Sequence, residues 1–171
     1  MNKIDLNKIV LDEGIDESSL EITESVDYKL DCKDTKDVNI YILKNIKVSL
    51  TEIEDTHTDD KVYNYFISDN STLIINKFYD LSDIKEEINI YLNGYNSNVI
   101  LNLSMISKGS HVYKINVHHN NKNTNSMTNV HGVTLGSNKI EIENRRNEAE
   151  KSLNAIISKK EKHQFLFLSA I

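Results

Sequence analysis

The sequence predicts a mainly β protein assembled from many short strands. Apolar and polar residues alternate in segment after segment, which is the period of two expected of a strand with one buried face. These segments recur every ~10–15 residues, a spacing typical of all-β folds. The bends between them are rich in Asn, Gly and Ser, as in "NGYNSN" and "SKGS". A sandwich of hairpins and a parallel β-helix fit this pattern about equally.

The expected strands follow one another along most of the chain. In "EINIYL", for example, Ile88, Ile90 and Leu92 share one face. Many strands carry Asn, Ser, Thr, Glu or Lys on the opposite face, as the wall of a solenoid does in coil after coil. Strands are expected within residues 20–30, 38–50, 61–67, 71–78, 87–92, 98–106, 111–117, 129–135 and 138–144.

The segment from Asn144 to Phe165 has a different period. Its apolar residues Ala149, Leu153, Ile156 and Ile157 recur at helical spacing, with charged residues elsewhere. Acidic residues lie early and lysines late, which complements a helix dipole. The sequence therefore predicts a short helix near the C-terminus, followed by a closing strand in "FLFLSAI".

Length and charge narrow the class of protein. The 171 residues suit a single domain spanning 1–171, and 39% hydrophobic with 27% charged residues is typical of a globular protein. The net charge of −6, without a basic stripe, argues against a nucleic-acid partner. The apolar runs are too short for a signal peptide or a membrane span, so we expect a cytoplasmic protein without membrane contact.

Cysteine, proline and asparagine usage add three expectations. The single cysteine, Cys32, excludes an internal disulfide and a site made only of cysteines. Charged neighbours in "KLDCKD" predict that Cys32 is partly exposed and a bystander. Proline is absent, and asparagine occurs 22 times. Asparagine suits tight bends and stacked corners, but an AT-rich genome is the explanation that we prefer.

Four histidines lie close together in the sequence, which raises the question of a metal site. His118 and His119 are neighbours on an expected strand, so they should point to opposite faces, with His119 facing inward like His111. A site from His111, His119 and His131 would still need a carboxylate or Cys32 from far away. No HxxxH or CxxC spacing supports it. We therefore prefer a half-buried histidine at a corner, hydrogen-bonded to backbone, over a metal ligand.

Catalytic motifs are weak throughout the chain. There is no GxSxG, and the paired carboxylates in "LDEGIDE" and "HTDD" suit solvated surface or turns. A polysaccharide-active solenoid would need clustered Asp and Arg on one wall, but the only arginines are Arg145 and Arg146 in the expected helix. We expect no enzyme and no catalytic residue.

The stretch "VHHNNKNTNSMTNVHGVTLGSNKIEIEN" resembles the core of the SufB/SufD family, the scaffold proteins of the SUF iron–sulfur cluster assembly system. A His-His pair closes a strand, Thr and Ser follow a few residues later, and Gly-Val precedes a bend and another strand. A Gln then precedes "FLFLS" at nearly the family distance. The residues that carry the resemblance are His118, His119, Thr124, Ser126, Gly132 and Gln164.

This resemblance implies a right-handed parallel β-helix with a role near iron–sulfur cluster assembly. The implied partners are a SufC-like ATPase or a full-length SufB-like protein, and a cluster is expected only together with such a partner. The family's cysteine, glutamate and histidine of the nascent-cluster site, and its SufC-docking helices, have no counterpart in this sequence. The isolated chain is therefore expected to hold no cofactor.

We accordingly expect the protein to be non-enzymatic and to act through protein–protein contacts. The alternatives are a stand-alone β-solenoid interaction or structural protein with no cluster role, and a His-based metal-binding protein. His118, Thr124 and Ser126 are expected to fix a corner by hydrogen bonds. Phe165, Phe167 and Leu168, apolar on both faces of their strand, are a candidate interface at the solenoid end, which could join two copies; alternatively, the helix covers that end.

Overall fold

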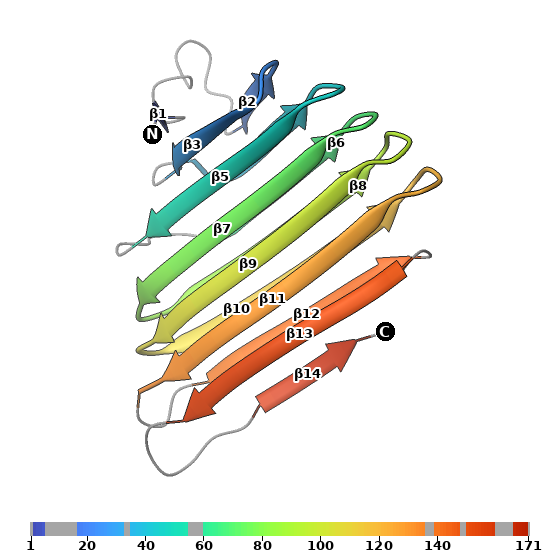
Figure 1. The fold of residues 1–171 in the computed structure, drawn as a ribbon. Coiled ribbons are helices and arrows are strands. Elements are labelled where there is room, and N and C mark those ends of the chain that lie inside the picture. The colour runs from blue at the N-terminus through green and yellow to red at the C-terminus, as the bar shows by residue number, and fades with distance from the viewer. Residues whose placement is uncertain are drawn as a thin grey trace.

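Two parallel β-sheets lie face to face and form a β-solenoid (Figure 1). The computed structural model describes residues 2–5, 17–32, 35–54, 60–135, 139–147, 150–159 and 166–170. Successive strands alternate between the sheets, so that two strands make one coil. We call the sheets the odd sheet (β1-β3-β5-β7-β9-β11-β13) and the even sheet (β14-β12-β10-β8-β6-β4-β2).

The strands have the following bounds in chain order. The odd sheet contains β1 (Asn2–Asp5), β3 (Val26–Asp31), β5 (Lys47–Glu54), β7 (Thr72–Leu81), β9 (Asn98–Ser107), β11 (Asn125–Thr134) and β13 (Glu150–Lys159). The even sheet contains β2 (Glu17–Ile22), β4 (Asp37–Ile42), β6 (Lys61–Ile67), β8 (Ile84–Leu92), β10 (Ser110–His119), β12 (Lys139–Asn147) and β14 (Leu166–Ala170).

Each strand pairs in parallel with the strand one coil later. Partners are 20 residues apart where Glu17 faces Asp37, and 29 apart where Ser110 faces Lys139. Strands that follow each other in the chain belong to different sheets, so the sandwich of hairpins is excluded for the described residues. The expected parallel solenoid is confirmed.

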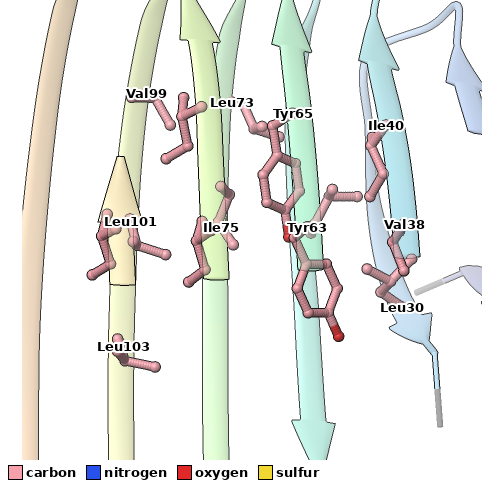
Figure 2. Packing of buried hydrophobic residues seen from close by; sticks show 14 of the residues in the cluster. Leu30, Val38, Ile40, Tyr63, Tyr65, Leu73, Ile75, Val99, Leu101 and Leu103 are labelled. Atoms are coloured by element: carbon pink, nitrogen blue, oxygen red, sulfur yellow. The ribbon is translucent and has the colours of Figure 1, made fainter. Parts of the chain in front are cut away.

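The core lies between the two sheets and consists of the inward residues of each strand. Ile88, Ile90 and Leu92 are fully buried, as their alternation predicted. Figure 2 shows Leu101 and Ile75 of the odd sheet with Tyr63 of the even sheet in this space. The cluster is continuous from Ile22 to Ile140, so all coils in this span share one apolar interior.

Asparagines occupy the same corner position in four successive coils. Asn45, Asn70, Asn96 and Asn123 have φ between 54° and 63°, the left-handed region that asparagine tolerates better than most residues. The Asn70 amide donates to Asn45 Oδ1 at 3.2 Å, and the Asn96 amide donates to Asn70 Oδ1 at 3.3 Å. Close packing adds a second constraint, because a Cβ on Gly94 would lie 2.1 Å from the backbone nitrogen of Asp69.

Asparagine also forms amide ladders on the outer faces of both sheets. On the even sheet, Asn64 donates to Asn39 and Asn89 donates to Asn64, both at 3.0 Å. Stacked amides satisfy one another's donors and acceptors along the solenoid. Asparagine therefore has a structural role that base composition alone does not explain. The ladders are Asn39-Asn64-Asn89-Asn116 on the even sheet and Asn76-Asn102-Asn129 on the odd sheet.

Three expectations about the elements are corrected. The predicted helix over 144–165 is wrong where the structure describes it, because β12 ends at Asn147 and β13 spans Glu150–Lys159. In β13 the alternate residues Leu153, Ala155 and Ile157 are in register with Thr128, Val130 and Gly132 of β11, so pairing with a strand overrides the helical spacing. Segments 20–30 and 38–50 each contain two strands separated by a corner.

In the described part of the chain, no helix is long and apolar enough to cross a membrane.

The corner geometry predicts a difference between two substitutions at Asn70. Both Asn70→Gly and Asn70→Val remove the ladder amide, but only valine is strained at a φ of 54°. We expect Asn70→Val to be less stable than Asn70→Gly by about 1–2 kcal/mol. Urea unfolding followed by circular dichroism measures this difference, and equal stabilities would show that the corner relaxes to another conformation.

Candidate functional site

The corner between β10 and β11 brings three residues of the sequence motif together. His119 ends β10, Thr124 precedes β11, and Ser126 is the second residue of β11. His119 Nδ1 lies 2.8 Å from Thr124 Oγ1, and its Nε2 lies 3.0 Å from Ser126 Oγ. Both hydroxyl residues are buried. The imidazole therefore links the end of β10 in the even sheet to the start of β11 in the odd sheet.

The hydrogen bonds of His119 fit an imidazole ring that carries its proton on Nδ1. Thr124 Oγ1 donates to the backbone oxygen of Asn121 at 3.1 Å, so it accepts a hydrogen bond from the N–H at His119 Nδ1. His119 Nε2 then accepts from the hydroxyl of Ser126, as in a neutral ring. Ser126 is only 1% exposed, so this hydroxyl is shielded from a substrate in solution. The arrangement suits a structural corner better than nucleophilic catalysis.

His118 lies on the other side of the same strand. Its ring stacks on Tyr91 at 4.8 Å between centroids with an interplanar angle of 8°. The two histidines thus point to opposite faces, as their neighbouring positions predicted. The expectation that His118 shares hydrogen bonds with Thr124 and Ser126 is corrected, because His119 makes them. His118 instead ends the outer aromatic row Tyr41-Phe66-Tyr91-His118.

The other motif residues have different surroundings. A Cβ on Gly132 would lie 3.0 Å from Ile140 Cδ1 and 3.3 Å from Met105 Cγ, so the tight space between the sheets favours glycine. Gln164 and Phe165 lie outside the described residues. Phe167 and Leu168 belong to β14, the last strand in the order of the even sheet.

The three candidate metal ligands do not converge. His111 is fully buried, with Nε2 3.0 Å from Leu81 O and Nδ1 3.2 Å from Tyr113 OH. Burial lowers the pKa of His111, which favours the neutral ring. His131 is exposed on the outer face of the odd sheet, away from the interior. Across the ranges that the structure describes, no three His, Cys, Asp or Glu residues could hold one metal ion together.

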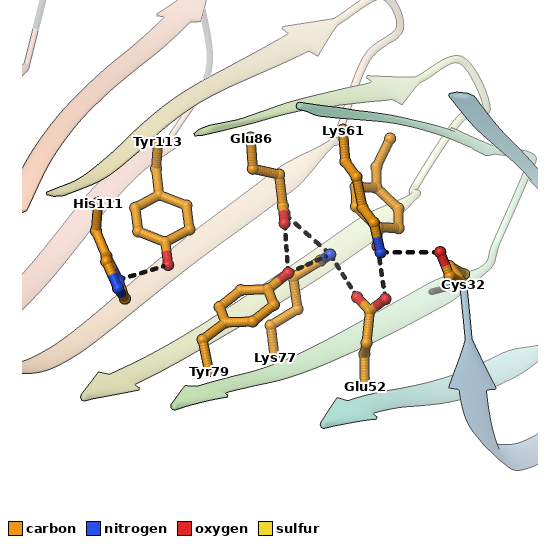
Figure 3. Close-up of polar contacts among 9 residues, drawn as sticks. Cys32, Glu52, Lys61, Lys77, Tyr79, Glu86, His111 and Tyr113 are labelled. Carbon is orange, nitrogen blue, oxygen red and sulfur yellow. Dashed lines mark hydrogen bonds and ion pairs between the residues drawn. The ribbon is translucent and has the colours of Figure 1, made fainter. Parts of the chain in front are cut away.

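The interior contains a cluster of ionised and phenolic side chains centred on Lys77 (Figure 3). Lys77 Nζ lies 2.6 Å from Glu52 Oε2 and 2.9 Å from Glu86 Oε1. The same ammonium donates to Tyr79 OH at 2.9 Å and lies 3.2 Å from the centroid of the Tyr63 ring. We call Glu52, Tyr63, Lys77, Tyr79 and Glu86 the interior polar cluster.

Each member of the interior polar cluster has a hydrogen-bonding or ion-pair partner within the cluster. Tyr63 donates to Glu52 at 2.5 Å, and Tyr79 donates to Glu86. Glu52 and Lys77 are register partners in β5 and β7, whereas Glu86 reaches across from the even sheet. Removing one partner of such a buried pair leaves an uncompensated charge, which is more costly than never having the pair.

Burial and charge shift the pKa values in this cluster. Burial by itself would lower the pKa of Lys77, but Glu52 and Glu86 outweigh it and raise that pKa above the ordinary value. Burial raises the pKa of Glu86, and the nearby Lys77 counteracts part of this effect. Burial and the neighbouring carboxylates also raise the pKa values of Tyr63 and Tyr79. Lys77 therefore keeps its positive charge. Glu86 has an increased tendency to keep its proton.

The signal of this cluster in the sequence is strand parity. Lys77 shares parity with Leu73, Ile75 and Tyr79, all of which are buried. The expectation that charged strand residues face solvent is wrong for Lys77. The same assumption failed for Cys32, which is only 1% exposed rather than partly exposed as expected. Lys61, also buried, donates to the Cys32 backbone oxygen at 2.8 Å.

Comparison of the chain with protein-family models, with curated proteins and with solved structures found no match. The interpretation of the corner and of the interior polar cluster therefore depends on their geometry alone.

The corner predicts unequal effects for its two adjacent histidines. His119→Ala leaves the buried Ser126 hydroxyl without its His119 partner, which costs about 1–3 kcal/mol, whereas the Thr124 hydroxyl keeps its bond to the Asn121 backbone oxygen. His118→Ala removes a partly exposed stacking contact, for which about 0.5–1.5 kcal/mol is expected. Urea unfolding of both variants measures the difference. A larger loss for His118→Ala would contradict the assignment of His119 as the corner residue.

The raised pKa of Glu86 predicts a pH-dependent stability. The folded state holds the Glu86 proton more tightly than the unfolded state, whose pKa is near 4.5. This contribution to stability is complete below the unfolded pKa and is lost as pH rises through the folded pKa. Glu86→Gln does not titrate, so its free energy of unfolding should rise relative to wild type as pH increases above 4.5.

Urea unfolding at a series of pH values from acid to neutral measures this relative change. Glu87→Gln on the outer face is the matched control, because its side chain is 36% exposed and solvent screens its charge. A constant difference between Glu86→Gln and wild type across the series would show that Glu86 does not titrate as assigned.

Proposed function

We propose that the chain is a non-enzymatic SufB/SufD-like protein associated with iron–sulfur cluster assembly, acting through protein–protein contacts. The observation that supports this best is the corner of His119, Thr124 and Ser126. These residues carry the sequence resemblance, and in a parallel solenoid they meet through hydrogen bonds of 2.8 and 3.0 Å. Three of the six residues that carry the resemblance thus meet at one corner of the solenoid.

In this proposal an iron–sulfur cluster is cargo held together with a partner. The one cysteine is buried, and the described residues contain no group of three candidate metal ligands. Thiolates are the usual ligands of such clusters, so most ligands would have to come from another protein. A SufC-like ATPase or a full-length SufB-like protein is the partner that the proposal names.

A second candidate is a stand-alone β-solenoid that acts as an interaction or structural protein without a cluster role. The amide ladders favour it, because their hydrogen bonds join neighbouring coils and give the outer asparagines a structural role. A His-based metal-binding protein is less well supported, since His131 is on the outside while His111 is in the interior.

The proposal predicts a specific pull-down from native lysate of the source cells. The tagged full chain should enrich a SufC-type ATPase or a full-length SufB-type protein, identified by mass spectrometry. Iron and sulfide should be present in the same sample, and zinc is assayed alongside them. An unrelated protein of similar negative charge with the same tag is the control, because an acidic chain attracts basic proteins non-specifically.

Recovery of the chain alone, without iron or sulfide, would contradict the cluster role and favour the stand-alone solenoid. Stoichiometric zinc without either partner would favour the metal-binding alternative, and substitution of His119 or His131 would then test its ligands. The reciprocal experiment, with a tagged SufC-type ATPase as bait, separates direct binding from capture through a third protein.

A further inference from the structure

The contact between Lys77 and Glu52 holds an amine and a carboxyl group together in the interior of the solenoid. Lys77 Nζ lies 2.6 Å from Glu52 Oε2, and the two side chains are only 1% and 5% exposed. Both residues face inward and are register partners in the adjacent parallel strands β5 and β7. A primary amine and a carboxyl group in fixed contact are the two reactants of an amide bond.

Glu86 supplies a second carboxyl group at the same nitrogen. Its Oε1 lies 2.9 Å from Lys77 Nζ, and Figure 3 shows the lysine nitrogen between the two carboxyl groups. Glu86 is buried and belongs to β8 in the even sheet. Burial raises the pKa of Glu86, so this carboxyl keeps a proton over a wider pH range than an exposed glutamate does. The amine therefore has one carboxyl to react with and another that can donate a proton.

Two aromatic rings enclose these groups. Lys77 Nζ lies 3.2 Å from the centroid of the Tyr63 ring and 5.6 Å from that of the Tyr79 ring, and both rings are fully buried. Tyr63 donates to Glu52 Oε1 at 2.5 Å, and Tyr79 donates to Glu86 Oε2. The phenols hold both carboxyl groups in place, and a site of this kind protects a product from hydrolysis because it excludes water.

The ion pairs on the outer face of the even sheet differ in their solvation. Lys85 Nζ lies 2.8 Å from Asp60 Oδ2, but the side chains are 68% and 60% exposed. Exposed pairs of this kind contribute about 0–1 kcal/mol, because water competes for both ions. Distance alone therefore does not single out Lys77, whereas burial together with a second carboxyl group does.

Amide formation between Lys77 and Glu52 would remove two buried charges. An ion taken into an apolar interior loses its hydration, and its partner compensates only part of that cost. Condensation converts the pair into one neutral amide and one water molecule, so burial favours the product. Groups held in reactive contact reach effective molarities of about 10⁵–10⁸ M, which favours a reaction that separate amines and acids in water do not complete.

We propose that Lys77 and Glu52 become joined by an intramolecular amide bond that links β5 to β7, with Glu86 as the proton donor. This cross-link is independent of the proposed role in cluster assembly. It needs no oxidant, cofactor or partner, because all the reacting groups belong to the interior polar cluster.

Atoms and protons balance within the interior polar cluster. Lys77 first passes a proton to Glu52 Oε2, which gives a neutral amine and a neutral acid. Lys77 Nζ then forms a bond to Glu52 Cδ, while the Tyr63 hydroxyl donates to Oε1, where negative charge develops. Glu86 donates a proton to Oε2, the Cδ–Oε2 bond breaks, and one water molecule leaves. Glu86 finally recovers a proton from the new amide nitrogen.

The charge of Lys77 sets the pace of this reaction. The neighbouring carboxylates raise the pKa of Lys77, so the charged pair predominates and the amide forms slowly from the neutral fraction. Once the amide has formed, no ammonium counteracts the effect of burial on the pKa of Glu86. The pH dependence of stability predicted for Glu86 therefore keeps its direction.

Intact mass spectrometry of the full chain tests the proposal. Conversion should lower the 19.6 kDa mass by that of one water molecule, and the converted fraction is followed from purification through days of incubation under native conditions. Proteolysis and tandem mass spectrometry should then identify a peptide of β5 joined to one of β7 through Glu52 and Lys77. Lys85 and Asp60 are the internal control, because they are similarly close but exposed and should remain separate.

Two variants test the assigned roles, and circular dichroism melting establishes that each is folded. Lys77→Arg keeps the positive charge but has no primary amine, so it should show no mass loss. Glu86→Gln keeps the shape of the side chain without its acidic proton and should slow conversion by about 10²–10⁴-fold.

A wild-type chain that retains its full mass after incubation overturns the proposal. So does a loss of water that maps to any pair other than Lys77 and Glu52, including a cyclised aspartate. Unchanged conversion in a folded Glu86→Gln variant contradicts the assignment of Glu86 as the proton donor.

Discussion

In-register stacking of the coils is the constraint on which the rest of the structure depends. Each residue in a strand lies beside its counterpart one coil away, so every inward and outward position becomes a row that runs along the solenoid. Chemically similar residues can then satisfy each other. Amide donates to amide in the ladders, and ring stacks on ring from Tyr41 through Phe66 to Tyr91.

Strand parity could be predicted from the sequence, because alternation is a local property. It placed Ile88 and Ile90 in the core and separated His118 from His119 correctly. Register could not be predicted in this way, since it depends on which strand, some 25 residues away in much of the solenoid, lies alongside. The helix prediction failed for the same reason. The apolar residues of β13 satisfy helical spacing locally, but pairing with β11 decides their structure.

The candidate site was predictable only in part. The motif located the corner, but the choice between adjacent histidines required the path of the chain from β10 into β11. The interior polar cluster was harder, because Lys77 faces inward only if its charge has partners there. Glu52 comes from the neighbouring coil and Glu86 from the opposite sheet, and neither is close to Lys77 in a reading of single strands. Buried polar networks of this kind contribute to a unique packing only when all members are present.

The nearly constant sequence separation between paired strands also has a consequence for folding kinetics. Every parallel pair in the described part closes a loop of 20 to 29 residues, from Glu17 with Asp37 to Ser110 with Lys139. Loop-closure entropy depends only weakly on length in this range, so successive coils meet similar entropic barriers. Repeat architectures of this type can nucleate in one region and grow outward by adding neighbours. The interior polar cluster joins β5 through β8. We therefore expect the nucleus to form in these central coils, and the outer coils to add to it.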